Sequence, residues 1–159
     1  IGFEDTETGR KAVFSALEPE EEKELLVKVN EVFKNSKGQQ LVTFRGRSFD
    51  LRVLIHRMLA HGIKPSPVLV GAAREYRYRP VTHIDLWDQF TFYGAGSGTL
   101  RAFCLGYGLG DPKADGDGGD VAALVAAGKK EELERYCQSD VAFTVALFKR
   151  WRDAVGVAA

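Results

Sequence analysis

The feature that most constrains the fold is an apolar run followed at once by a tight turn and an amphipathic helix. Residues 41–44 have the composition of a short buried strand, and residues 45–47 form the turn. Ser48 is a suitable N-cap for the next helix, and Gly62 is a suitable stop signal. The helix carries apolar residues at helical spacing: Leu51, Leu54, Ile55, Met58 and Leu59. A strand, a turn and a helix in this order predict an α/β protein.

Patterns elsewhere in the chain add further elements. Residues 1–17 combine strand-forming residues with a polar turn and predict a β-hairpin. Helical spacing predicts helices over residues 19–35 and 129–154. Residues 99–106, which follow several glycines and end at another, are predicted to form a short helix, and residues 81–86 are predicted to be extended.

Length and composition bound the class of protein. The chain has 159 residues, 45% hydrophobic and 28% charged, which suits one soluble domain with a sizeable core. The 22 basic and 22 acidic residues cancel, which argues against coating of nucleic acid by bulk charge but allows a local basic patch. The two cysteines cannot alone form a disulfide framework or a four-ligand metal site. Because the sequence carries no secretory signal or membrane-spanning run, we expect an intracellular protein with no membrane partner.

The last predicted helix places an acidic residue on its apolar face. At about 100° per residue, Asp140 falls about 20° from Leu133, on the face that also carries Phe148. A buried carboxylate needs a hydrogen-bond donor, a cation or a metal ion. Tyr136 lies one turn earlier, so its hydroxyl can reach the space beside the carboxylate. Asp140 is therefore either a functional acid or one half of a buried Tyr–Asp hydrogen bond.

A second acidic candidate is Asp50, in the first turn of the helix that follows the strand of residues 41–44. Open α/β sheets bind ligands at the carboxyl ends of their strands, where Asp50 is expected to lie. An acidic residue in a first turn is also favoured by the helix dipole, regardless of function.

The segment of residues 74–79 alternates arginine with tyrosine. Arg77 and Tyr78 could grip backbone phosphates and stack on bases of a nucleic acid. The alternative is an ordinary surface segment in which arginine stacks on tyrosine.

Four motifs resemble, in order and spacing, those of the DEDDy 3′→5′ exonucleases. In particular, they are similar to the predicted exonucleases related to the proofreading domain of B-family DNA polymerases, and the similarity covers nearly the whole chain. The motifs are TFRGRSFDL at residues 43–51, HIDL at 83–86, DGGDV at 117–121 and YCQSD at 136–140.

This resemblance implies a ribonuclease H-like fold, in which helices flank a mixed sheet, and two divalent cations, Mg²⁺ or Mn²⁺, held by four carboxylates. Asp50 would be the second-motif carboxylate and a metal ligand. Asp140 would be the third-motif metal ligand, and Tyr136 would orient the attacking water. The family usually has asparagine where this chain has Arg45, so Arg45 is a candidate substrate contact that departs from the family pattern.

The first motif of the family is an Asp-x-Glu on the first strand. Asp5 and Glu7 spell such a motif, but the fold needs three strands before its first helix, and only seventeen residues precede Glu18. We therefore interpret Asp5 and Glu7 as part of a hairpin turn. We expect one domain over residues 1–159 that lacks its first strand at the N-terminus.

The first functional hypothesis is a metal-dependent 3′→5′ exonuclease acting on single-stranded 3′ ends, with DNA favoured over RNA. The second is a ribonuclease H-like module that binds nucleic acid without cutting it. A third is an unrelated α/β domain with a buried Tyr–Asp pair.

Overall fold

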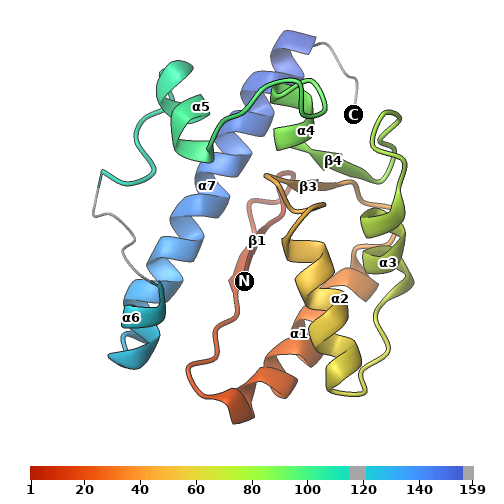
Figure 1. Cartoon of the computed structure of the whole chain (residues 1–159), viewed down its shortest axis with the longest axis vertical. Coiled ribbons are helices and arrows are strands. Elements are labelled where there is room, and N and C mark those ends of the chain that lie inside the picture. The colour runs from red at the N-terminus through yellow and green to blue at the C-terminus, as the bar shows by residue number, and fades with distance from the viewer. Residues whose placement is uncertain (115–120, 156–159) are drawn as a thin grey trace. The chain divides into compact units, whose positions relative to one another are not determined.

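The computed structural model describes residues 1–114 and 121–155 (Figure 1). The chain forms two compact units, one of residues 18–97 and one that joins residues 1–17 to residues 98–159. Each unit has its own two-stranded sheet. The single domain expected over residues 1–159 stays a prediction.

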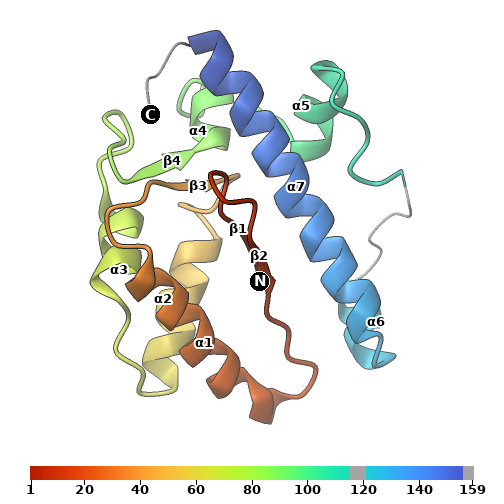
Figure 2. The same cartoon turned by 180° about the vertical axis from the view of Figure 1, so that it is seen from behind.

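The unit of residues 18–97 is built on two parallel strands. β3 (Leu41–Thr43) pairs with β4 (His83–Asp85), so that Thr43 lies opposite Asp85 at their carboxyl ends. Figures 1 and 2 show three of its helices, α1, α2 and α3, side by side below this strand pair. In chain order the helices are the 3-10 turn η1 (Pro19–Glu21), α1 (Glu22–Asn35), α2 (Asp50–Ala60), α3 (Pro67–Arg74) and α4 (Leu86–Phe90).

The apolar faces of these helices form the core of the unit. Buried residues recur every three or four positions along α1 and α2, which is the spacing of one helix face. They are Leu26, Val29 and Phe33 in α1, and Leu51, Leu54 and Met58 in α2. Burying one such side chain completely stabilises a fold by about 1.5–3 kcal/mol. The helical spacing in residues 19–35 and 51–59 therefore predicted both elements correctly.

Helix α3 is not predicted by apolar spacing, because eight residues span little more than two turns. Its start is encoded by a cap: the Ser66 hydroxyl accepts a hydrogen bond from the Val68 amide at 3.2 Å, and Pro67 occupies the first helical position. A buried amide in α1 anchors this start. Asn30 accepts from the Ser66 amide at 2.7 Å and donates to the Lys64 carbonyl at 3.0 Å.

The predicted N-cap of α2 is wrong. The chain continues through a turn as far as Phe49, and α2 begins at Asp50 with no side-chain cap. The Ser48 hydroxyl instead donates to the Arg45 carbonyl at 3.1 Å and stabilises the turn.

The other unit joins a hairpin to the C-terminal helices. β1 (Gly2–Glu4) pairs antiparallel with β2 (Lys11–Val13), which confirms the hairpin predicted within residues 1–17. β1 lies against α7 (Lys130–Val155), and Gly2 permits the close approach because a Cβ there would lie 2.8 Å from a methyl carbon of Val141. α5 (Leu100–Gly106) and α6 (Val121–Ala126) also contact α7.

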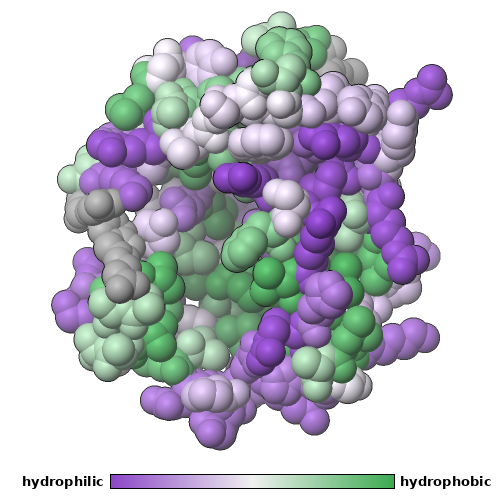
Figure 3. Space-filling model, in the orientation of Figure 1, coloured by the Kyte–Doolittle hydropathy of each residue, from purple (hydrophilic) through white to green (hydrophobic). Residues whose placement is uncertain are grey.

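The expected α/β class is confirmed at the level of small sheets flanked by helices. The described residues contain two two-stranded sheets, and the larger ribonuclease H-like sheet stays a prediction. Hydrophilic and hydrophobic residues are interspersed over the face shown in Figure 3. Within residues 1–114 and 121–155, no helix has both the length and the apolar character needed to cross a membrane.

An ion-pair cluster that ties α1 to α2 makes stability depend on pH. Glu22 at the start of α1 bonds Arg57 and, at 2.6 Å, His61 at the end of α2. The Arg57 and His61 hydrogen bonds lower the pKa of Glu22 from 4.5 to about 2. Because the folded pKa lies below the unfolded value, the stabilisation is complete above pH 4.5 and is lost as the pH falls towards 2.

We predict that Glu22→Gln lowers the thermal unfolding temperature at pH 7. The difference from the wild type should shrink as the pH falls from 5 to 2, where the wild-type carboxylate is itself protonated. Calorimetry across this range checks the prediction. Glu24→Gln, which removes a more exposed carboxylate from the same helix, is the matched control. A difference between Glu22→Gln and the wild type that stays constant with pH would contradict it.

Candidate functional site

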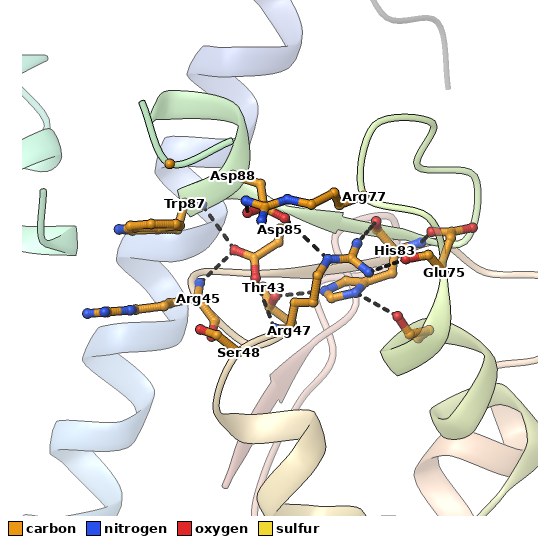
Figure 4. Close-up of polar contacts among 12 residues, drawn as sticks. Thr43, Arg45, Arg47, Ser48, Glu75, Arg77, His83, Asp85, Trp87 and Asp88 are labelled. Carbon is orange, nitrogen blue, oxygen red and sulfur yellow. Dashed lines mark hydrogen bonds and ion pairs between the residues drawn. The ribbon is translucent and has the colours of Figure 1, made fainter. Parts of the chain in front are cut away.

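A single carboxylate organises the carboxyl ends of the two parallel strands. Asp85, the last residue of β4, is buried and accepts hydrogen bonds from the backbone amides of Arg45, Arg47 and Trp87 at 2.7, 2.9 and 3.1 Å (Figure 4). The Trp87 bond caps α4, and the other two hold the turn that follows β3. The candidate Arg45 therefore lies on a turn that Asp85 of β4 holds in place, and Asp50 follows that turn.

The turn after β3 has a geometry that few residues tolerate. Arg45 adopts a left-handed backbone conformation, with φ of 66°, which disfavours side chains with a Cβ. Gly46 is required by space, because a Cβ there would lie 2.6 Å from the Cβ of Thr43. The exposed Arg45 guanidinium lies over the Trp87 ring, 5.3 Å from its centroid.

Asp50 follows this turn as the first residue of α2. Its side chain is exposed, and it makes no hydrogen bond or ion pair with another residue in the described part of the chain. Displacement of water by surrounding protein raises the pKa of its carboxyl, and the negative charge of Asp85 raises it further. Asp50 is thus an acid that the unit leaves available to an external cation.

Arg47, in the turn after β3, makes side-chain hydrogen bonds to several neighbouring segments. Its Nε donates to Asp88 at 3.2 Å, and its two terminal nitrogens donate to the Glu75 and His83 carbonyls at 2.7 and 3.3 Å (Figure 4). These bonds connect the turn to β4, α4 and the segment before β4. The planar guanidinium satisfies partners in three directions, which an ammonium group could not do with the same geometry.

His83, which sequence position alone placed near the site, is a structural residue. It is fully buried, and its Nδ1 must donate to the Ala72 carbonyl at 3.1 Å, so its Nε2 accepts from the Thr43 hydroxyl at 2.8 Å. Burial and the nearby Arg47 lower the pKa of His83 to about 4. The ring is therefore neutral at pH 7, and because it is buried with both nitrogens in hydrogen bonds it is not available as a general base.

Arg77 and Tyr78, the predicted nucleic-acid contacts of this unit, lie next to each other but differ in availability. The Arg77 guanidinium pairs with Asp88 and lies 5.7 and 5.8 Å from the ring centroids of Tyr78 and Tyr93. This is the geometry of the alternative in which arginine stacks on tyrosine. The Tyr78 ring keeps about half of its surface exposed, at 52%.

In the other unit, Tyr136 and Asp140 lie one turn apart on α7, as the sequence predicts. Burial raises the pKa of the half-buried Asp140 carboxyl, while the Tyr136 hydrogen bond and the charge of Lys113 oppose that rise. Burial raises the pKa of the Cys104 thiol, on α5, to about 11, and the negative charge of Asp140 contributes to this rise. The Tyr–Asp hydrogen bond exists, and it occupies only part of the acceptor capacity of the carboxylate.

Asp5 and Glu7 lie in the turn between β1 and β2. The Asp5 carboxylate accepts from the amides of Glu7 and Thr8 at 2.9 and 3.0 Å, and these bonds lower its pKa. This turn supports the hairpin interpretation of the pair.

Within the described residues, no three histidine, cysteine, aspartate or glutamate side chains lie close enough together to hold a metal ion. Residues 117–120 of the DGGDV motif lie outside the described residues.

These features define an α/β protein with an available acid beside a parallel strand pair and a Tyr–Asp pair on its last helix. Residues 4–157 match the family described as predicted 3′-5′ exonucleases related to the exonuclease domain of PolB. The chain belongs to this family. Searches of curated proteins and of solved structures each give no significant match.

We predict that two similar substitutions beside the turn have different effects on stability. Asp85→Asn removes acceptor capacity from three backbone amides and should lower the free energy of unfolding by about 1–3 kcal/mol. Asp50→Asn should be neutral or stabilising, since the folded unit disfavours the charge that it removes. Urea unfolding at pH 7 measures both values. Equal losses in the two variants would contradict this division of roles.

Proposed function

We propose that this protein is a metal-dependent exonuclease of the DEDDy type that removes nucleotides from the 3′ ends of single-stranded DNA. The observation that carries the proposal is the family match over residues 4–157, within which Asp50 is an acid that bonds no other residue among those described. Tyr136 and Asp140 stand in the Tyr-x-x-x-Asp spacing of the tyrosine branch.

The donors suit a hard divalent cation. Carboxylate oxygens favour Mg²⁺ or Mn²⁺, and the raised pKa values of Asp50 and Asp140 mean that each carboxylate gains from a neighbouring positive charge. Asp50 and Asp140 would hold the ions. When bound, a pair of such ions activates water and stabilises the oxygen that leaves phosphorus. The Tyr136 hydroxyl would orient the water, and Arg45 would meet a substrate phosphate.

A second function, binding of nucleic acid without cleavage, is favoured by one specific observation. Two carboxylates are assigned where the family uses four, and the described residues contain no group of three candidate ligands. Such a module would hold a single strand through Arg45 and Tyr78 and release it unchanged.

Exonuclease activity is tested with a 5′-labelled single-stranded DNA and Mn²⁺. We expect a ladder of shortened products that disappears with EDTA and falls at least a hundredfold in Asp140→Asn. Tyr136→Phe should cut more slowly with substrate affinity preserved. Asp153→Asn, the same change at an exposed position of α7, is the matched control and should cut normally. Retained binding without products in the wild type would support the binding module instead.

Metal binding is tested by thermal shift. Mn²⁺ should raise the unfolding temperature, because a ligand that binds only the folded state stabilises it. The shift should be lost in Asp50→Asn. It should also fade as the pH is lowered towards the raised pKa values of Asp50 and Asp140, since protons then compete with the metal. A shift of equal size in the wild type and in Asp50→Asn would show that Asp50 is not a metal ligand.

A further inference from the structure

Three tyrosine rings lie together in the unit of residues 18–97. The ring centroids of Tyr76 and Tyr78 lie 5.3 Å apart, and those of Tyr78 and Tyr93 lie 4.5 Å apart. Tyr76 is 66% exposed and Tyr78 is 52% exposed, so neither ring belongs to the buried core. We call Tyr76, Tyr78 and Tyr93 the aromatic strip.

The backbone under the strip is held in an unfavourable conformation. Phe92 and Tyr93 are consecutive residues with left-handed φ values of 49° and 62°, a region that usually takes glycine or asparagine. Buried Thr91 enforces the turn: its hydroxyl donates to the Trp87 carbonyl at 2.6 Å and accepts from the Gly94 amide at 3.1 Å. Strain that the surrounding structure maintains is typical of functional sites.

Contacts with Arg77 also hold rings of the strip in place. Arg77 lies over the Tyr78 and Tyr93 rings and pairs with buried Asp88, which Arg47 bonds from the other side. The rings are therefore positioned before any ligand arrives, which reduces the entropy lost on binding. The side chains of Arg74 and Arg79, at the two ends of the Arg/Tyr segment, are exposed and make no ion pair in the described part of the chain.

We propose that the aromatic strip is a stacking surface for the unpaired bases of a single-stranded nucleic acid, with Arg74 and Arg79 meeting its phosphates. Flat, rigid rings flanked by free guanidinium groups match a ligand that alternates bases with phosphates. The strip adds Tyr76 and Tyr93 to the predicted contact Tyr78. It deepens the proposed function, on which it rests for the class of substrate, by naming what holds the strand.

The test measures binding of a fluorescein-labelled fifteen-nucleotide thymidine strand by anisotropy in EDTA, so that no cleavage occurs. Tyr76→Ala/Tyr78→Ala should weaken binding at least tenfold, since each removes an exposed stacking ring. Leu59→Ala, at an exposed apolar position of α2, is the matched control and should bind as the wild type does. Unfolding temperatures confirm that both variants fold.

A strand in which abasic sites replace the bases separates stacking from charge. The wild type should lose at least tenfold in affinity on this strand, and the double variant should lose little further, because bases and rings act through the same contact. Arg74→Gln/Arg79→Gln should instead reduce the salt dependence of binding.

Binding to the thymidine strand within twofold of wild type in the double variant, or no wild-type binding at all, overturns the strip. The outcome is separable from that of the proposed function. If the protein binds bases through the rings but never shortens DNA, the stacking proposal stands and the exonuclease proposal fails. If it shortens DNA equally well with and without the rings, the exonuclease proposal stands and the stacking proposal fails.

Discussion

The carboxylate of Asp85 supports much of the arrangement in the unit of residues 18–97. It accepts three backbone amides at the point where β3 turns into α2 and β4 turns into α4. Without it these part-buried donors would lose their acceptor, and the turn with a left-handed Arg45 would lose two of its hydrogen bonds. Because Arg47 is fixed by the same carboxylate, its side chain can bond Asp88, Glu75 and His83 and so join the turn to the segment before β4. Arg45, in this turn, and Asp50, which follows it, are both exposed.

Elements with clear periodicity or clear flanking signals could be predicted from the sequence, and other short ones could not. Helices α1, α2 and α7 follow from helical spacing, the hairpin from its turn residues, β3 from an apolar run, and α5 from the glycines on either side of it. Helices α3, α4 and α6 span eight, five and six residues, too few for a period to show. Their signals are caps, such as Ser66 and Asp85, and a cap is ambiguous alone. Ser48 shows this, since it has the right chemistry for a cap and serves the turn instead.

The candidate site was predictable where an acid stood in an unusual place. Asp140 was predicted because it lies on the apolar side of its helix, and Asp50 because it follows a strand. Asp85 also lies at the carboxyl end of a strand, and sequence cannot separate it from Asp50. Their partners separate them: Asp85 accepts the backbone amides of three other residues, whereas Asp50 bonds no other residue in the described part of the chain. In the same way, Arg77 could not be assigned to a substrate or to Asp88 until the tertiary fold brought Asp88 beside it.

The burial of neutral His83 makes the stability of the folded unit fall as the pH falls. An unfolded histidine titrates near 6.5, whereas His83 in the folded unit resists protonation until about pH 4. Between these values the proton behaves as a ligand of the unfolded chain, and each step towards acid draws the folding equilibrium away from the native state. The imidazole hydrogen-bonds Thr43 of β3 and Ala72 of α3, so the charge of a protonated ring would lie in the interior of the unit. The resulting pH dependence of folding belongs to the scaffold and is independent of any ion that the carboxylates hold.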